Sequence, residues 1–384
     1  MEGLVISLST EQKNRAQQVS SLFSNAYSGK TVFITGHTGF KGSWLCEWLL
    51  LLGARVVGYS LPAPTQPALF DLLGLRTRIR HIDGDIRELN ALTEALVDAN
   101  PDFVFHLAAQ TIVRDSYQRP IETFSTNALG TAHVLEAARS LTKNCGVICV
   151  TTDKCYENHE WHYGYREVDP LGGHDPYSSS KAAAEIVIAS WRRSFFRSHP
   201  VKIASVRAGN VIGGGDWAQD RIVPDCIRAL QCGNPIPVRN PKATRPWQHV
   251  LEPLSGYLLL AARIYGASLD DLCSAFNFGP RHESNRSVAE MVQEILTHWP
   301  GTWEDKSELG APHEAGRLNL AIDKAFHLLA WQPVWSFGQA VAKTVEWYRY
   351  CGIEVKEKEA IAFTRQQITE YETAAREKGL SWAS

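Results

Sequence analysis

Three glycines at fixed spacing, between a strand pattern and a helix pattern, constrain the fold of this chain most strongly. Thr31–Thr35 (TVFIT) is a short, β-branched apolar run typical of a buried strand. It ends in the turn Gly36-His37-Thr38-Gly39-Phe40-Lys41-Gly42, and a helix pattern over 41–52 follows. Arg55–Tyr59 is again a strand pattern. Strand, glycine turn, helix and strand in this order form a βαβ unit, so we predict a fold of the α/β class.

The same alternation of strands and helices continues to about Gly209. Further strand patterns are Arg80–Asp83, Phe103–Leu107, Gly146–Thr151 and Ile203–Arg207, and the helix patterns between them are Arg87–Ala99, Phe124–Arg139 and Tyr177–Phe195. Strands that alternate with helices lie parallel in one sheet, and helices cover both of its faces. We therefore predict a Rossmann-type doubly wound parallel sheet with a second, smaller mixed α/β domain.

The boundaries of these parts follow from changes in pattern along the 384 residues. Residues 1–29 are polar and weakly patterned, and we predict an N-terminal extension outside the fold. Residues 30–208 are predicted to form the dinucleotide-binding Rossmann domain. Glycine- and proline-rich loops become frequent beyond Gly209, so 209–384 are predicted to be mainly a substrate-binding domain, with some segments returning to the Rossmann domain.

Charge and cysteine content exclude several classes of function. Lys and Arg number 39 and Asp and Glu 41, and the net charge of −2 does not favour a basic nucleic-acid-binding domain. No apolar run reaches the ~20 residues of a membrane span, and the first residues lack the pattern of a secretory signal. Among eight scattered cysteines there is no C-x-x-C pair, so we expect reduced thiols and no metal site. We expect a cytoplasmic protein that binds neither nucleic acid nor membrane.

The glycine turn predicts a site for the phosphates of a dinucleotide. Gly36 permits the tight turn, Gly39 allows close approach of the pyrophosphate, and Gly42 lets the helix pack on the sheet. The helix N-terminus directs unpaired N–H groups and a positive dipole end at the phosphates, and Lys41 can add charge. The acid that usually binds the NAD ribose after the second strand is missing, and only Ser60 offers a hydrogen bond there. Because no arginine for a 2′-phosphate stands there either, we expect NAD rather than NADP.

Two pairs of residues supply groups for proton transfer. Tyr177 and Lys181 stand four positions apart in a helix pattern, so they share one face. A nearby ammonium would lower the pKa of the phenol, and a tyrosinate can take a hydroxyl proton while a hydride leaves to a nicotinamide. Asp153 and Lys154 follow the strand pattern at 146–151, at the carboxyl end of a strand where ligands bind in open α/β sheets. This extra acid and base indicate further proton transfers.

The spacing of the glycine turn and the Tyr177–Lys181 pair resemble the extended short-chain dehydrogenase/reductase superfamily. Thr151–Tyr156 (TTDKCY) resembles the Thr-Asp-Glu signature of its nucleotide-sugar 4,6-dehydratases, with Lys154 where most members carry Glu. The segment looks like the branch that acts on CDP-glucose. The blocks that share this resemblance are Gly36–Trp44, Arg207–Trp217, Asp220–Asp225, Arg245–Gly256, Asn277–Pro280 and His313-Glu314-Ala315, and it covers about residues 28–350.

The resemblance implies a lyase that converts CDP-D-glucose to CDP-4-keto-6-deoxy-D-glucose and water with an internally recycled NAD. Tyr177 would remove the C4 hydroxyl proton while the hydride leaves C4, and the hydride would return at C6. Asp153 would protonate the leaving C6 hydroxyl, and Lys154 is the candidate base at C5. A lysine that stays protonated, near its usual pKa of about 10.4, would instead stabilise the enolate. Thr151 or Thr152 resembles the hydroxyl-bearing member of the catalytic set.

The resemblance and the glycine turn together give the expected site residues. The catalytic residues are Thr152, Asp153, Lys154, Tyr177 and Lys181. The cofactor-binding residues are Gly36, His37, Thr38, Gly39, Phe40, Lys41, Gly42, Ser60, Asp85, Ile86, Leu107, Ala108, Ala109, Thr126, Thr151, Tyr177 and Lys181. The substrate-binding residues are Asn210, Arg221, Arg245, Asn277, Arg281 and His313. Arg245 resembles the diphosphate-binding arginine of the family, and a homodimer joined through the helix of Tyr177 is expected.

Other functions predict different features. A 4-epimerase usually lacks the acid-plus-base pair Asp153-Lys154, whereas a dehydratase for another nucleotide shares it. A nucleotide-binding sensor commonly loses the Tyr177–Lys181 pair. An ordinary redox enzyme that turns over external NAD(P)H predicts a net absorbance change at 340 nm, and internal recycling predicts almost none.

Overall fold

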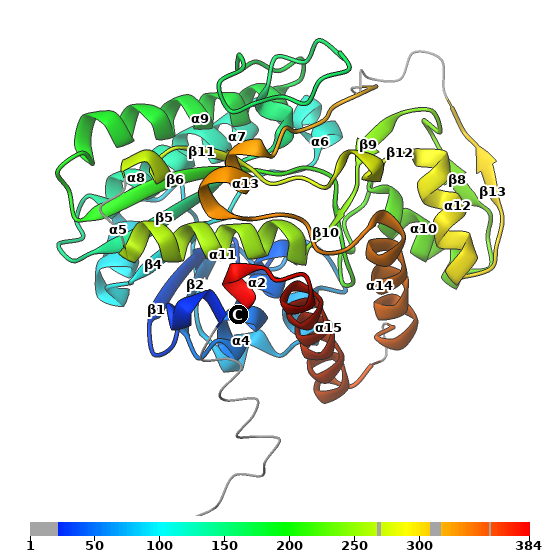
Figure 1. Ribbon diagram of the computed structural model, residues 1–384, viewed down its shortest axis with the longest axis horizontal. Helices are drawn as coiled ribbons and strands as arrows, with labels where there is room; N and C mark the ends of the chain where they lie inside the picture. Colours follow the sequence, from blue (N-terminus) through cyan, green and yellow to red (C-terminus); the bar gives the residue numbers. More distant parts are fainter. Residues whose placement is uncertain (1–21, 267–269, 308–315, 353–354) are drawn as a thin grey trace, which may run out of the picture.

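A seven-stranded parallel sheet forms the centre of the computed structural model, which describes residues 22–266, 270–307, 316–352 and 355–384 (Figure 1). The strand order is β11-β6-β5-β4-β1-β2-β3. The strands are β1 Thr31–Thr35, β2 Arg55–Ser60, β3 Arg80–Asp83, β4 Phe103–His106, β5 Cys145–Val150, β6 Val201–Arg207 and β11 Ala275–Asn277. The chain runs outward from β1 to β3 and then returns to β4 on the other side of β1, and ligands bind in such sheets where the order reverses. The predicted Rossmann-type sheet is confirmed.

Helices cover both faces of the sheet because successive strand residues point to opposite sides. Val32 and Ile34 of β1 pack into one buried apolar cluster with α2 and α11, whereas Phe33 packs into the cluster on the opposite face. The helices of the first face are α2 Phe40–Leu51 and α11 Leu251–Gly266, and those of the second are α5 Leu89–Ala99, α8 Gly130–Ala138 and α9 Pro176–Phe195. The central strands are buried on both sides, which explains their continuous apolar runs.

One predicted helix is divided. The pattern at 124–139 corresponds to α7 Pro120–Phe124, a π-helical turn at Ser125–Leu129 and α8. A π-turn shifts the register of the helix, and such turns are frequent at functional sites. It lies beside α9, the helix that carries Tyr177.

The C-terminal half supplies both the edge strand β11 and a group of smaller elements beside the sheet (Figure 1). Two short parallel strands, β8 and β13, pair there, and β9 pairs with β12. The other strands of this half are β7 Val211–Ile212, β8 Ile236–Val238, β9 Thr244–Pro246, β10 Gln248–His249, β12 Asn285–Ser287 and β13 Trp303–Asp305. Its further α-helices are α10 Ile222–Gln231, α12 Val288–His298, α13 Asp323–Leu329, α14 Phe337–Tyr350 and α15 Glu357–Glu377. The N-terminal half also contains the short helices α3 Leu69–Leu72, α4 Leu75–Arg78 and α6 Val113–Gln118. In the described ranges, no helix combines the length and the apolar character that a membrane span requires.

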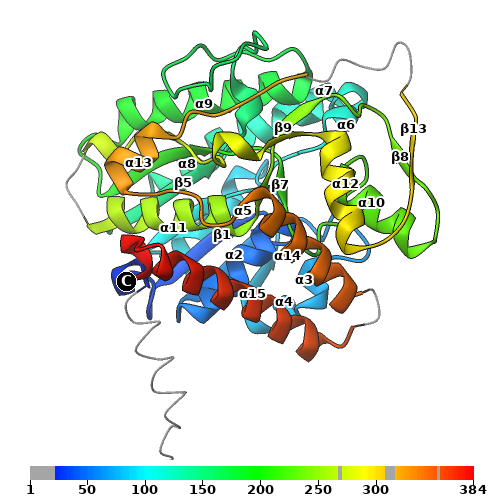
Figure 2. The same cartoon turned by 45° about the vertical axis from the view of Figure 1, so that its right-hand side comes forward.

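The segment before β1 belongs to the fold. Phe23 and Tyr27 are buried, the Phe23 ring stacks on Trp382 at 5.0 Å, and the Tyr27 hydroxyl donates to the Leu258 carbonyl oxygen at 2.6 Å. The prediction of an extension outside the fold is therefore wrong for residues 22–29, because apolar contacts distant in sequence bury them. Residues 1–21 lie outside the described residues. α15 packs along α2 and contacts Ser381–Ala383, which in turn contact Leu22–Asn25 (Figure 2).

Candidate active site

A cavity of about 820 Å³ lies where the carboxyl ends of the central strands meet the C-terminal half. This volume is within the range of small-molecule sites. The predicted site residues that line it are Gly36, Thr38, Gly39, Phe40, Lys41, Gly42, Ser60, Asp85, Ile86, Leu107, Ala108, Ala109, Thr126, Thr151, Thr152, Asp153, Lys154, Tyr177, Lys181, Asn210, Arg221 and Arg245. His313 lies outside the described residues.

The glycine turn has the shape that a phosphate cradle needs. Gly36 has φ +74°, and a Cβ there would lie 2.6 Å from the Ala108 nitrogen. A Cβ on Gly42 would lie 2.4 Å from the Gly36 carbonyl oxygen. Gly39 is the N-cap of α2 and has no side chain that could bind the first N–H groups of this 12-residue helix. These N–H groups are therefore available to a ligand in the cavity. The backbone thus fits a dinucleotide phosphate.

Ser60, the last residue of β2, occupies the position at which an acid usually binds the ribose of NAD. The Thr38 hydroxyl donates to the Leu61 carbonyl oxygen at 3.0 Å, so Ser60 must donate its own proton to Thr38, 2.9 Å away. The Ser60 oxygen then offers lone pairs, which can accept from a ribose hydroxyl. Further along the wall, the carboxylate of Asp85 accepts from the Arg87 side chain, which lowers the pKa of Asp85.

Lys41 contributes less charge than its position in the turn suggests. Burial, then Arg221 and Lys181, lower the pKa of Lys41 to about 7, against the opposing effect of Asp153. Its amine lies 3.4 Å from the Tyr257 hydroxyl. The side chain is therefore partly neutral near pH 7.

Tyr177, Thr152 and Lys181 come together at the end of β5. A hydrogen bond with Thr152 lowers the pKa of Tyr177, but burial outweighs it and raises that pKa to about 12. Lys181 donates to the Val150 carbonyl oxygen at 3.2 Å, and burial lowers its pKa to about 8. The predicted lowering of the phenol pKa by Lys181 is therefore wrong for this arrangement, in which burial dominates. Thr152, and not Thr151, is the hydroxyl that contacts the tyrosine.

Asp153 is fully buried beside this group. Its carboxylate accepts from the Thr152 hydroxyl at 3.0 Å and from the Asn210 amide at 3.2 Å. A Cβ on Gly209 would lie 1.9 Å from Oδ2 of Asp153, so glycine is required there. Lys154 is half-buried in the same wall. An acid and an amine thus face one cavity with the tyrosine.

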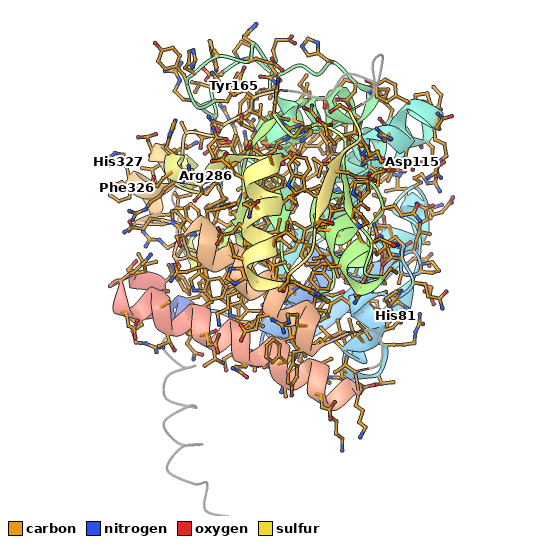
Figure 3. The ribbon with its side chains drawn as sticks, turned by 90° about the vertical axis from the view of Figure 1, so that its right-hand side faces the viewer. His81, Asp115, Tyr165, Arg286, Phe326 and His327 are labelled. Carbon is orange, nitrogen blue, oxygen red and sulfur yellow. The ribbon has the colours of Figure 1, made fainter. Side chains whose placement is uncertain are left out.

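Three predicted residues do not line this cavity. The His37 ring is buried over Gly58 and hydrogen-bonds His81 at 2.7 Å. Asn277 donates to the carbonyl oxygens of Tyr165 (labelled in Figure 3) and Ala321. The Arg281 guanidinium is exposed and donates to Gln332. We correct these three side chains to structural roles, because their polar groups bind the protein instead.

Further arginines at the cavity were not predicted from the sequence. Arg114 and Arg239 line it, and both lie close to Asp220. Arg114 follows the end of β4, so its position at the carboxyl edge of the sheet was a usable signal. Arg239 follows β8, a three-residue strand whose pairing with β13 is not visible in a local pattern.

Comparison with known proteins agrees with this geometry. A family model described as GDP-mannose 4,6 dehydratase matches residues 33–344. The chain belongs to this dehydratase family. A CDP-glucose 4,6-dehydratase from Salmonella typhimurium is 45% identical to this dehydratase over 359 residues, which cover 91% of the chain and 98% of that protein. A dTDP-glucose 4,6-dehydratase from Xanthomonas campestris is 27% identical over 83% of the chain and 93% of its own length.

Solved structures share the fold of this dehydratase. A dTDP-glucose 4,6-dehydratase from Streptomyces venezuelae matches with a TM-score of 0.72 and 23% identity, over 83% of this chain and 97% of that one. The protein MoeE5, solved in complex with UDP-glucuronic acid and NAD, matches with a TM-score of 0.67 and 26% identity over 83% and 99% of the two chains. The recognition of a short-chain dehydrogenase/reductase fold with nucleotide-sugar relatives is confirmed.

Proposed function

We propose that this chain is a CDP-glucose 4,6-dehydratase, a lyase that forms CDP-4-keto-6-deoxy-D-glucose and water. The observation that carries this function is the 45% identity to the Salmonella CDP-glucose 4,6-dehydratase over nearly the whole of both chains. The cavity supports it, since Tyr177, Asp153 and Lys154 share a wall with the glycine turn. The cofactor is NAD, which supplies a hydride acceptor when bound and would be held by the Gly36–Gly42 turn and Ser60.

Tyr177 removes the proton of the C4 hydroxyl in this mechanism. A phenol with a pKa of about 12 is a poor base near neutral pH, so a positive charge must face it when it ionises. The Thr152 hydroxyl can donate to the phenolate oxygen, and the positive charge of Arg221 lowers the pKa of Tyr177. Oxidation at C4 then acidifies the proton at C5.

Asp153 and Lys154 carry out the dehydration. Asp153 protonates the C6 hydroxyl as it leaves, and Thr152 and Asn210 orient its two oxygens. Lys154 removes the C5 proton, or, if it remains protonated, stabilises the enolate as a positive charge. Arg221 and Arg245, with Arg114 and Arg239, line the cavity and offer guanidinium groups that can donate to a diphosphate.

A homodimer is the second part of the proposal. Apolar side chains are exposed on α7, on the π-turn and on α9, and Ile121 is 81% exposed. The others are Phe124, Leu129, Ile186 and Phe195. The elements that carry them contact one another, so two copies can join through one apolar face. Ile121→Asp with Ile186→Asp is expected to give a monomer in analytical ultracentrifugation, and a dimer in this variant would contradict the proposed face.

The activity is tested by incubating the protein with NAD⁺ and, separately, CDP-, dTDP-, UDP- and GDP-hexoses. CDP-glucose should lose one water by mass, with almost no net change at 340 nm. Loss of water from dTDP-glucose but not from CDP-glucose would overturn the nucleotide assignment. A product of unchanged mass would indicate an epimerase.

A further inference from the structure

A buried ion pair lies behind the catalytic wall. Glu185, on α9 one turn after Lys181, accepts from Arg207 Nη2 at 2.8 Å, and the two side chains are 3% and 4% exposed. Burial raises the pKa of Glu185, but Arg207 and the hydrogen bonds of Thr151 and Ser205 outweigh it and hold that pKa below its usual value. Neither Glu185 nor Arg207 is among the described residues that line the cavity.

The pair holds both ends of the catalytic segment 152–155. At its N-terminal end, the Thr151 hydroxyl donates to Glu185 Oε1 at 2.5 Å. At its C-terminal end, Arg207 Nη1 donates to the Tyr156 hydroxyl at 2.7 Å, and the guanidinium lies over the Tyr156 ring at 4.8 Å. The Tyr156 hydroxyl in turn donates to Asn277 of β11 at 2.7 Å. The four residues between these two anchors include Thr152, Asp153 and Lys154.

The strand of Arg207 also reaches the acid from the other side. β6 ends at Arg207, and Gly209 and Asn210 follow two and three positions later. Gly209 leaves the space that the Asp153 carboxylate occupies, and Asn210 donates to it. A shift of Arg207 would therefore move both the backbone beneath Asp153 and its hydrogen-bond donor.

We propose that Glu185 and Arg207 are positioning residues that hold Asp153 and Lys154 in register for the dehydration step. The inference rests on the proposed 4,6-dehydratase function. Tyr177 and Lys181 lie on the long helix α9, which also packs against α7, α8 and β6, so their positions depend less on the pair than those of the segment 152–155 do. Burial lowers the pKa of Lys181 and Glu185 acts to raise it, and Tyr156→Phe leaves that effect of Glu185 in place. Loss of the pair thus slows dehydration more than oxidation at C4, since misplacement of reacting groups by about 1 Å can cost ~10²-fold in rate.

The test measures turnover, KM, thermal midpoint and absorbance at 340 nm with saturating NAD⁺ and CDP-glucose. Glu185→Gln is expected to lower kcat by about 10–100-fold and to change KM less than about threefold. Bound NADH should accumulate during turnover, because C4 oxidation outpaces dehydration. Tyr156→Phe, which keeps the ring and loses the hydroxyl that Arg207 holds, should show the same signature at about 3–10-fold.

Two further variants separate positioning from stability. Glu185→Gln leaves the buried charge of Arg207 without its ionic partner. Adding Arg207→Met to this variant removes that charge. The double variant is expected to recover the thermal midpoint but to keep the low kcat and the accumulated NADH. Glu47→Gln is the matched control, because Glu47 is equally buried and binds arginines remote from the segment 152–155. It should lower the thermal midpoint and leave kcat and the 340 nm signal unchanged.

The outcomes distinguish the positioning role from the activity itself. Wild-type protein that does not dehydrate CDP-glucose would overturn the proposed function. If the wild type is active, any one of three results would overturn the positioning role. These are wild-type turnover in Tyr156→Phe and Glu185→Gln, slower turnover in them without accumulated NADH, and wild-type kcat in the double variant.

Discussion

Glu185 and Glu47 lie at the same depth in the molecule, but they join different segments. Each carboxylate is almost fully buried and accepts from arginine. Arg207, the partner of Glu185, is 4% exposed, whereas Arg78 and Arg365, the partners of Glu47, are 20% and 35% exposed. The first pair joins α9 to β6 and contacts both ends of the catalytic segment through Thr151 and Tyr156, and the second ties α2 to α4 and α15.

The surroundings explain why the two glutamates should have different effects. Glu185 contacts residues at the carboxyl ends of strands, where the cavity lies. Glu47 precedes Trp48 on α2, and the Trp48 ring belongs to a cluster of aromatic side chains with Phe23, Tyr371 and Trp382. Solvent also screens the partly exposed arginines of Glu47. The same ionic chemistry thus positions reacting groups in one region and joins terminal segments in the other, so mutations should separate rate from stability.

The largest effect is expected at Asp153 on the catalytic side. Asp153→Asn removes the acid; its one remaining oxygen can accept from Asn210, and its new NH2 group can donate to the Thr152 hydroxyl, so the site keeps its shape while turnover should fall about 10³-fold (~4 kcal/mol). C4 oxidation should persist and appear as bound NADH at 340 nm. Turnover within tenfold of the wild type would show that Asp153 is not the general acid.

Trp382 gives the matching test on the terminal side. Its ring stacks on Phe23 and packs edge-on against Trp48, and it is 2% exposed. Trp382→Ala should lower the free energy of unfolding by about 3–4 kcal/mol, measured by urea denaturation, while kcat per folded molecule stays unchanged. A fall in kcat without a loss of stability would break the proposed separation of the two regions.

Gly209→Ala should lower both rate and stability, because the added Cβ crowds a fully buried carboxylate. The added Cβ would meet the Asp153 carboxylate, and the displaced acid should lower kcat about 10–100-fold, or ~1.4–2.7 kcal/mol. Gly352→Ala is the control, because a Cβ there meets no atom within 4 Å. Equal kcat values for the two variants would contradict the requirement for glycine at 209.

The smallest expected effect is a change in how the stability of the protein depends on pH, caused by His249. His249 packs between Trp44 and Trp335, and burial lowers its pKa to about 3. The unfolded chain takes up a proton near pH 6.5 that the folded chain refuses, so this histidine lowers stability as pH falls through 6.5. His249→Gln should reduce the stability lost between pH 7.5 and 5.5 by about 1.4 kcal/mol, from urea denaturation at both values. An unchanged loss would show that His249 takes up its proton in the folded state.

Local patterns in the sequence predicted the features that depend on neighbouring residues. Thr31–Thr35 and Arg80–Asp83 are strands with the predicted bounds. Spacing of four also placed Tyr177 and Lys181 at one cavity. Each of these features needs information from fewer than ten consecutive positions.

Features that depend on contacts distant in sequence were not predicted. Asn277 resembles a ligand-binding residue, yet its amide is used by Tyr165 and Ala321, which lie over 40 positions away. Glu185 and Arg207 are separated by 22 positions, and no local pattern connects them as a pair. The polar pattern at 22–29 concealed two buried aromatic rings, because Trp382 and Leu258 cover them only in the folded chain.

The contact between Phe23 and Trp382 also sets an order for folding during synthesis. Their positions differ by 382 − 23 = 359 residues, and ribosomes add about 5–20 residues per second, so Phe23 waits roughly 20–70 s for its partner. The sheet and the catalytic segment can assemble in that interval. The aromatic cluster around α2 can close only after Trp382 has been made.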